Sequence, residues 1–496
     1  MSQPPPVKSS PFATDVLKLV TGTTIAQIIA IAASPILTRL FGPEAFGFFA
    51  LFTSITAIIG VIACMRYELA IMLPKDDEAA ANLLALSFLM VSIISGLTAI
   101  GLYFGGEIFV TFLQAPGLSP YLWIVPPFIF MSGIFLALNY WNSRTRNFGR
   151  LSIARITRSI ATSGTQLAAG FAGFVTGGSL ISASLVGSVV STGILGGQIW
   201  REDKKHLKQS ISWQGMIEGL KRYKRFPLLD SGSALLNSIS WQLPVLLLSA
   251  FFSPVIVGFY AIGMRVLQTP MSLIGGSIAQ VFFQRASEAR RDGMLNILVE
   301  NVFKVLVLIG LFPLLILTFI GGDIFLVIFG DQWLEAGIYA QILGIWTFIW
   351  FISSPLSTLY IVLEKQDFGL KYNIANLITR LLSLVIGGFI GSVYIALTLF
   401  AISGIGVYGY LCISMLRFSG VSWLVVKKIL LSNLVIFTPV GIILICLKIF
   451  NFKPIFLVTI ATISLIVYYM YILKTDAQVQ AVCDQLGLSR YFKRIF

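Results

Sequence analysis

Two arginines lie deep inside apolar stretches of the chain. Arg265 is about ten residues into one stretch and Arg380 about nine into another, so at roughly 1.5 Å per residue both lie near the middle of a membrane-length helix. A charge at that depth costs roughly 2.5–3.5 kcal/mol on insertion scales and persists where it faces a bundle interior or a water-filled path. Guanidinium groups bind phosphate through paired N–H donors. The two arginines therefore predict contact with an anion, and a diphosphate is the natural candidate.

Both arginines belong to polar stripes, because residues three, four or seven apart share one face of a helix. The two stripes consist of Arg265, Gln268, Ser272 and Gly275, and of Asn373, Asn376 and Arg380. Two further stripes in the first half consist of Thr23, Gln27, Ser34 and Thr38 with Arg39 beyond them, and of Arg155, Arg158, Thr162 and Gln166. We expect these four faces to line one central cavity.

Other charges inside apolar stretches have simpler explanations beside a binding role. Arg66 is close enough in sequence to pair with Glu68, and Asp230 to meet Arg225 or another cation. In this alternative the pairs would be structural, and these residues would not contact a ligand.

Snorkelling is the corresponding alternative for Arg155 and Arg158, whose side chains are long enough to reach lipid headgroups. A buried structural pair is the alternative for Arg265 and Arg380. Neither of their stretches offers a carboxylate at similar depth, which favours contact with a bound anion.

The elements that carry these residues are apolar stretches of about 20 residues, long enough to cross a bilayer as helices. They fall at 17–39, 44–73, 82–104, 119–141, 152–175, 179–200, 226–250, 255–283, 296–321, 336–363, 371–391, 393–416, 424–448 and 453–474. Hydrophobic residues make up 57% of the 496 residues, charged residues 11%, and the mean hydropathy is +0.89, which excludes a soluble domain of ordinary size. The sequence predicts an all-α polytopic membrane protein with about 14 transmembrane helices.

Lys and Arg fall almost entirely on alternate loops. The opposite loops carry the acidic residues Glu107, Asp323, Asp331 and Glu335, with Lys453 as their basic exception. By the positive-inside rule both termini are expected in the cytoplasm. The net charge of +14 is then a topology signal and a contact for anionic headgroups, and we expect no nucleic-acid partner.

Short motifs recur in the same order in the two halves of the chain. Segments 41–50, 105–109 and 147–149 recur at 252–261, 321–325 and 367–369. Gly and Phe are abundant, so one such match can arise by chance, but all three fall in equivalent loops. Each copy holds an even number of spans, so the sequence predicts two six-helix bundles related by a parallel repeat about an axis along the membrane normal, plus two C-terminal helices.

This repeat divides the chain into expected segments. They are a disordered cytoplasmic tail at 1–16, an N-terminal bundle at 17–200, a basic cytoplasmic linker at 201–225, a C-terminal bundle at 226–416, helices 13 and 14 at 417–474, and a cytoplasmic amphipathic tail at 475–496.

Signals of catalysis, metals and nucleotides are weak. The single histidine, His206, falls in a charged loop, and the four cysteines lie at no metal-ligand spacing, so we expect no enzyme, metal site or disulfide. Residues 404–409 match G-x-G-x-x-G, but they fall inside an apolar span without a preceding strand, where glycines commonly serve helix packing. No catalytic residue and no cofactor is predicted.

Several motifs carry a resemblance to a known family. Residues 66–75, RYELAIMLPK, with 79–86 resemble the junction between the second and third spans of bacterial polysaccharide-repeat flippases. The similarity continues over Leu138–Arg144, Phe226-Pro227, Gln242–Pro244, Val257–Tyr260 and Pro270–Phe282, and covers essentially the first twelve spans. The chain thus resembles the O-antigen and exopolysaccharide flippases of the multidrug/oligosaccharidyl-lipid/polysaccharide exporter superfamily.

This resemblance implies a function in cell-surface polysaccharide biosynthesis, including lipopolysaccharide O-antigen. Such a protein would move undecaprenyl-diphosphate-linked oligosaccharide from the cytoplasmic to the periplasmic leaflet of the bacterial inner membrane by alternating access. Arg265 is also similar in placement to a cationic cavity residue of lipid II flippases. Membrane lipids, a polysaccharide polymerase and a chain-length regulator are the candidate partners.

The resemblance and the polar stripes together assign expected roles to particular residues. Arg265 and Arg380 would hold the diphosphate. Entry or exit would be served by Arg39, Arg66, Arg155 and Arg158, and sugar hydroxyls would be hydrogen-bonded by Gln27, Gln268, Asn373 and Asn376.

Two other classes of protein are alternatives. A cation-coupled drug exporter of the same superfamily would need acidic cavity residues, for which only Asp230 and Glu68 are candidates. A membrane glycosyltransferase or polymerase would need catalytic residues on a sizeable outside loop, and the longest such loops are about 14 residues, too short to build an active site.

Overall fold

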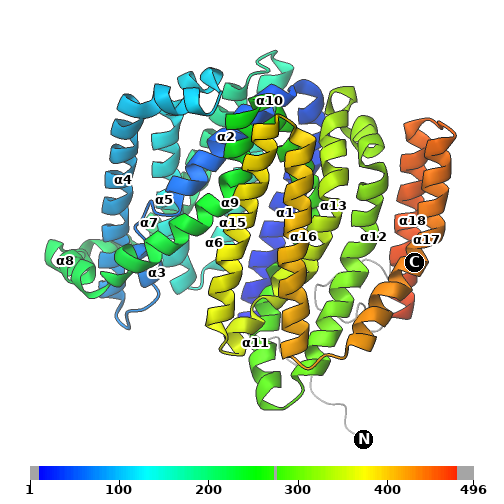
Figure 1. Cartoon of the computed structure of the whole chain (residues 1–496). Coiled ribbons are helices and arrows are strands. Elements are labelled where there is room, and N and C mark those ends of the chain that lie inside the picture. Colours follow the sequence, from blue (N-terminus) through cyan, green and yellow to red (C-terminus); the bar gives the residue numbers. More distant parts are fainter. Residues whose placement is uncertain (1–10, 273–275, 477–496) are drawn as a thin grey trace, which may run out of the picture. The chain divides into compact units, whose positions relative to one another are not determined.

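The computed structural model describes residues 11–272 and 276–476 of the chain (Figure 1). These residues form helices and no strand. Twelve helical segments among them are long and apolar enough to cross a membrane. The expected class, an all-α polytopic membrane protein, is therefore confirmed. The helix expected in the tail at 475–496 falls almost entirely outside the described residues.

The chain forms two compact units, Met1–Gly258 and Phe259–Phe496, each described by itself. The first contains α1 (Pro11–Leu40), α2 (Pro43–Gly60), α3 (Tyr67–Ala70), α4 (Asp77–Phe112), η1 (Pro116–Ile124), α5 (Val125–Arg144), α6 (Phe148–Phe171), α7 (Gly177–Ser210), α8 (Trp213–Arg222), η2 (Phe226–Asp230), α9 (Ser231–Phe251) and the start of α10 (Pro254–Leu267). The second contains the rest of α10, α11 (Gly276–Arg291), α12 (Leu295–Phe329), η4 (Asp331–Trp333), α13 (Leu334–Leu356), α14 (Leu359–Val362), α15 (Gln366–Ile390), α16 (Val393–Phe418), α17 (Trp423–Ile449) and α18 (Pro454–Thr475). The bundle boundaries expected from the repeat stay a prediction.

The expected count of fourteen spans is not confirmed, because two predicted spans differ in the structure. The span at 152–175 corresponds to α6, an intact helix that its arginines make too polar to count as a candidate span. The span at 255–283 is not one helix, since α10 ends at Leu267, Pro270 follows, and α11 begins at Gly276. Proline lacks the N–H that a continuous helix requires.

A third predicted span, 44–73, is interrupted near its end. α2 stops at Gly60, and residues 61–66 form tight turns whose N–H groups bond about three residues back before α3 begins. Met65 and Arg66 have φ of 51° and 62°, a left-handed conformation that is uncommon for residues other than glycine. A hydropathy pattern does not report this break, because the residues on both sides of it remain apolar.

An arginine at the end of α5 holds the turn that follows α3. Arg144 donates to the carbonyls of Ile71 (3.2 Å) and Pro74 (2.8 Å) and to the carboxylate of Asp77 (2.8 Å). In the second unit, Arg290 donates to the carbonyl of Val362 and to the carboxylate of Glu364 (3.0 Å). In the first unit the arginine ends α5 and its partners follow α3. In the second unit the arginine lies at the end of α11 and its partners lie at the end of α14 and just after it. The repeat-equivalent connections are thus joined in both halves, but the arginine and the carboxylate have exchanged places.

The internal repeat is also visible in where helices begin and end. The helices α4, α6 and α7 of the first unit match α12, α15 and α16 of the second in order and in start position. Residues with positive φ end equivalent helices or follow them closely, in the pairs Gln114 and Gly330, Arg146 and Glu364, and Gly173 and Gly391. The duplication expected from short motifs therefore extends to the backbone.

Repeat-equivalent glycines make a reciprocal contact at the starts of α2 and α10. A Cβ on Gly47 would overlap the carbonyl oxygen of Pro254, and a Cβ on Gly258 would overlap that of Pro43. The prolines open the two helices, where a missing N–H costs nothing. Small residues allow helix backbones to approach this closely within a membrane protein.

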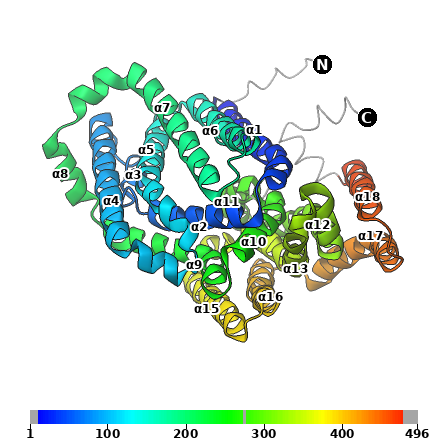
Figure 2. The same cartoon turned by 90° about the horizontal axis from the view of Figure 1, so that it is seen from above.

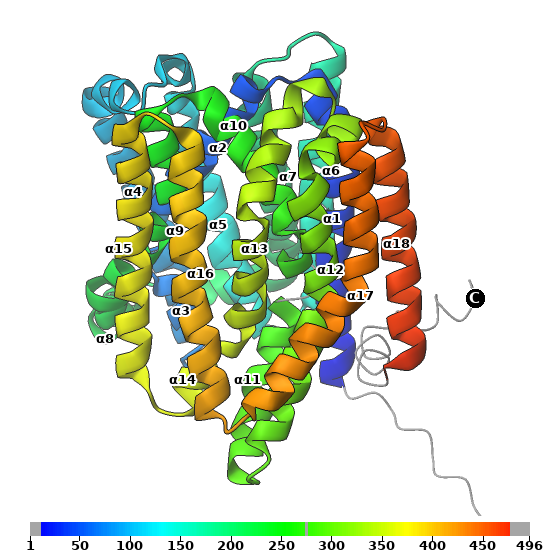
Figure 3. The same ribbon diagram turned by 45° about the vertical axis from the view of Figure 1, so that its right-hand side comes forward.

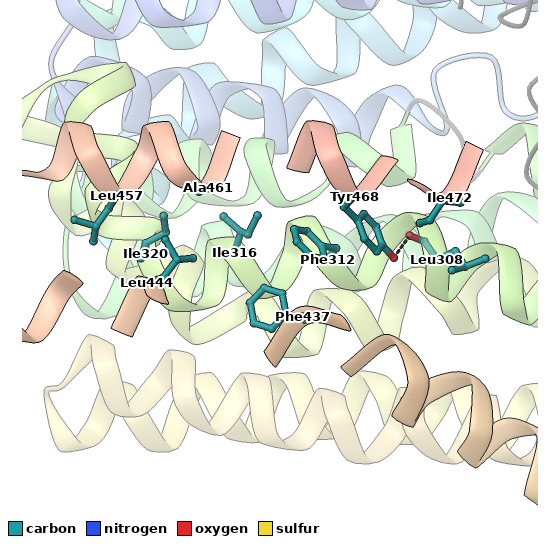
Figure 4. Packing of buried hydrophobic residues seen from close by; sticks show 10 residues of the cluster. All are labelled: Leu308, Phe312, Ile316, Ile320, Phe437, Leu444, Leu457, Ala461, Tyr468 and Ile472. Atoms are coloured by element: carbon teal, nitrogen blue, oxygen red, sulfur yellow. Dashed lines mark hydrogen bonds between the residues drawn. The ribbon is translucent and has the colours of Figure 1, made fainter. Parts of the chain in front are cut away.

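In the second unit, α17 and α18 pack beside α12 (Figure 3). An apolar cluster joins the three helices (Figure 4) and includes Phe312, Phe437 and Tyr468. The rings of Phe312 and Tyr468 stack with centroids 4.1 Å apart, and Phe437 meets Phe312 edge-on at 5.3 Å. These contacts hold the two C-terminal helices on the second unit.

Polar contacts also join α18 to a proline-containing part of α12. Pro313 has no N–H, so the carbonyl of Ile309 loses its helical donor. The hydroxyl of Tyr469 donates to that carbonyl (2.8 Å), and the hydroxyl of Tyr468 to the carbonyl of Leu308 (2.8 Å). The helix added to the repeat thus satisfies the backbone that the proline leaves open.

We predict that Tyr469→Phe lowers stability by about 1 kcal/mol, because a carbonyl away from water then lacks a donor. Tyr471→Phe, at an exposed position two residues on, is the matched control. The measurement is thermal unfolding of the detergent-purified protein. Equal melting temperatures for the two variants would contradict the proposed role of Tyr469.

Alanine at Gly47 or at Gly258 should each lower stability by about 3 kcal/mol, because backbone rather than a movable side chain occupies the site of the new Cβ. Gly96→Ala, inside α4 with open space around its Cα, is the control and should be neutral or slightly stabilising. Folded yield and melting temperature would be compared, and a harmless alanine at position 47 or 258 would refute the close approach.

Candidate functional site

The predicted stripes on α1 and α6 lie against each other in the first unit. The guanidinium of Arg155 donates to the hydroxyl of Thr23 (2.6 Å), and Ser159 donates to the carbonyl of Ala26 (2.7 Å). Gly22 gives the helices room, since a Cβ there would overlap Ser152. The structure thus brings together Arg155 and the part of α1 that carries Gln27.

The other predicted arginines of this unit occupy separate surroundings. Arg158 is half-buried, with its guanidinium 5.9 Å from the centroid of the Phe135 ring. Arg39 is exposed at the end of α1. Helix α6 contains arginines and no acidic residue along its length.

An ionic cluster forms where α2 is interrupted. Arg66 donates through Nε to Asp230 (2.7 Å), and its Nη1 lies 3.6 Å from Oε1 of Glu68. The expected pairing of Arg66 with Glu68 is present, and the cation that meets Asp230 is Arg66. Asp230 ends η2, a π-helical turn that leads into α9.

Glu68 is the most buried member of this cluster, at 1% exposure, and neither carboxylate oxygen accepts a hydrogen bond. Burying a charge without hydrogen bonds is costly, so Arg66 is its main compensation. Asp230 is 44% exposed and can be solvated instead. Arg66 therefore has a structural task whether or not it also meets a ligand.

In the second unit, Arg380 and Asn376 converge on Tyr408 of α16. Arg380 Nη2 donates to the phenol oxygen at 2.7 Å, and Asn376 Nδ2 donates to it at 3.3 Å. All three side chains are buried, Arg380 at 4% exposure. The polar face of α15 therefore packs on α16, and Asn373 lies exposed beyond this contact.

Sequence reasoning did not identify Tyr408, which lies inside the glycine-rich segment 404–409. The flanking Gly404 admits the indole of Trp346, whose ring centroid is 6.4 Å from that of Tyr408. A phenol in an otherwise apolar span, on a helix beside one that carries an arginine, is the signal that could have identified it.

Arg265 lies near the end of α10 and has an exposed side chain. Gln268 follows after the helix ends at Leu267, and Ser272 bonds to the carbonyl of Thr269 (2.9 Å). The expected continuous stripe is therefore interrupted, and its last member, Gly275, lies outside the described residues. A guanidinium on an exposed residue of an apolar helix is suited in chemistry to hold an anion.

These features define a multi-pass helical membrane protein with arginines on helices of both units. A family model described as "Polysaccharide biosynthesis protein" matches residues 36–338, and the chain belongs to this family. The resemblance predicted from the sequence is confirmed. A curated relative, the teichuronic acid biosynthesis protein TuaB of Bacillus subtilis (strain 168), is 23% identical over 341 residues, which cover 67% of this chain and 68% of that protein.

Solved structures of similar fold include a flippase and a drug transporter. The lipid II flippase MurJ in an inward closed conformation has a TM-score of 0.69 at 13% identity, over 91% of this chain and 98% of its own. An inward-facing multidrug resistance MATE transporter of the MOP superfamily has a TM-score of 0.61 at 13% identity, over 82% and 98%. At these identities the likeness shows the fold alone.

We predict that Arg66→Ala costs about 3 kcal/mol, because it leaves the Glu68 carboxylate buried without a cation. Asp230→Asn removes only a part-exposed partner and should cost about 1 kcal/mol or less. Glu68→Gln added to Arg66→Ala should restore much of the loss. Melting temperatures of the three variants test this order, and failure of Glu68→Gln to rescue would show that Arg66 acts mainly through other contacts.

Proposed function

We propose that this protein is a flippase, not an enzyme, that moves oligosaccharide linked to a polyprenyl diphosphate across a bacterial cytoplasmic membrane. The observation that carries the proposal is the sign of the charge on mid-membrane helices. Arg155 and Arg158 on α6, Arg265 on α10 and Arg380 on α15 lie on helices whose only carboxylate is Asp367, in the first turn of α15. Cationic helices suit a diphosphate headgroup.

The roles of these residues follow from their surroundings. Arg265, an exposed residue on an apolar helix, would bind the diphosphate directly. Arg380, held by Tyr408, would contribute its charge from a fixed position and would need only a small rearrangement to donate to an oxygen of the cargo. Gln27, Gln268, Asn373 and Asn376 would serve sugar hydroxyls, whose number and spacing vary between repeat units.

The orientation in the membrane belongs to the same proposal. Basic loops such as those that carry Arg144 and Arg290 would face the cytoplasm, as would both termini, by the positive-inside rule. Cargo would then be loaded at the basic ends of the helices and released at the opposite ends by alternating access.

The test is a flipping assay in liposomes that contain the purified protein and a polyprenyl-diphosphate oligosaccharide. We expect Arg265→Ala and Arg380→Ala each to reduce the flipping rate about tenfold or more at equal folded amounts, as loss of one charge-assisted contact of about 1.4 kcal/mol would do. Arg417→Ala, at an exposed position at the end of α16, is the control.

Tyr408→Phe separates charge from packing, because it removes the observed partner of Arg380 and keeps the guanidinium. Flipping that survives in Tyr408→Phe and falls in Arg380→Ala assigns the effect to charge. Unchanged flipping in both arginine variants would make these residues structural. Cation-driven drug efflux without any flipping by the wild type would instead favour the drug-exporter alternative.

A further inference from the structure

Helix α8 has an apolar face that its own unit does not cover. Trp213, Ile217 and Leu220 lie at i, i+4 and i+7 on one side of the helix and are 67%, 37% and 40% exposed. The helix has ten residues, so it is too short to cross a membrane and its exposed apolar face is not that of a span.

A second face fixes α8 against the first turns of α4 (Figures 1 and 2). A Cβ on Gly215 would overlap the carboxamide of Asn82, and one on Gly219 would lie 3.1 Å from Leu83. Asn82 also donates to the carbonyl of Ser210 and accepts from the N–H of Ser212, both at 2.8 Å. The helix is thus held at a set depth beside the start of a membrane-length helix.

The C-terminal end of α8 and its flanking segments are cationic, and Glu218 is the one acidic residue on α8 itself. Exposed basic residues on the end of α7 and around α8 are Arg201, Lys204, Lys205, Lys208, Lys221, Arg222, Lys224 and Arg225. The acidic residues Glu202 and Asp203 of the same segment pair with Arg150. The positive charge around α8 is therefore not neutralised by these two acids.

Tryptophan and lysine meet on the neighbouring helix as well. The ammonium groups of Lys204 and Lys208 lie 5.5 Å and 5.8 Å from the ring centroid of Trp200, which is 49% exposed. Exposed tryptophan with adjacent lysine is typical of the level where headgroups meet acyl chains. The end of α7 and α8 therefore share the chemistry of a bilayer interface.

We propose that α8 is an interfacial helix that binds anionic phospholipids of the adjoining leaflet. Trp213, Ile217 and Leu220 lie among the upper acyl chains, and Lys221, Arg222 and their basic neighbours bind headgroup phosphates. An amphipathic helix with a basic polar face binds in this way, and its affinity rises with the negative charge of the membrane. The binding site is separate from the proposed cargo residues and does not depend on the flippase function.

The test places the full-length protein in vesicles of phosphatidylcholine with a fixed fraction of phosphatidylglycerol, with bromine on the acyl chains of one lipid or the other. Bromine quenches nearby tryptophan, and the signal of Trp213 is the difference between wild type and Trp213→Phe. We expect brominated phosphatidylglycerol to quench Trp213 more than brominated phosphatidylcholine at the same fraction, and high salt to reduce the difference.

Charge variants make the test specific. Lys221→Gln with Arg222→Gln should lower the preference for phosphatidylglycerol about tenfold, since each basic group near an anionic surface contributes several-fold. Lys427→Gln with Lys428→Gln, exposed at the start of α17, should leave the signal of Trp213 unchanged. Quenching equal for the two lipids would overturn the selectivity for anionic lipid. Absence of quenching by either would mean that protein, such as a second copy of the chain, covers this face.

Discussion

Unsatisfied backbone is the constraint on which this fold depends, because the interior of a bilayer supplies no water to groups that a broken helix leaves open. Several interruptions of helices are matched by a side chain from another element. Tyr469 serves the carbonyl freed by Pro313. Gln341 donates to the carbonyl of Phe319 (2.8 Å) beside the non-helical Ile320. Arg144 and Arg290 do the same for the turns near Pro74 and Val362.

The same requirement explains why arginines in this chain have two kinds of surroundings. Arg144 and Arg380 donate to carbonyls, a carboxylate or a phenol of their own unit, and so stabilise it. Arg265 is an exposed residue near the end of a short apolar helix. Burial and donor geometry, rather than depth in a hydropathy plot, distinguish an arginine that holds the fold together from one that can meet a ligand.

The sequence predicted the helical class, the duplication and the local pairing of Arg66 with Glu68, because each depends on periodicity or on residues close in the chain. It did not predict the break after Gly60, the end of α10 at Leu267 or the role of Tyr408. These features depend on partners that are distant in sequence, such as Asp230 for Arg66 and α16 for Arg380. Pro270 lies inside the predicted span 255–283 and was a local signal for the break there.

The contact between the starts of α2 and α10 is isologous, like the interface of a twofold-symmetric dimer, because Gly47 faces Pro254 while Gly258 faces Pro43. A half-length ancestor could have made it with a second copy of itself, and fusion of two copies would preserve it. In the fused chain, the glycine of each repeat must stay small because of the backbone of the other repeat. The backbone of one half excludes a side chain at the glycine of the other, so the two copies could diverge elsewhere but not independently at this contact.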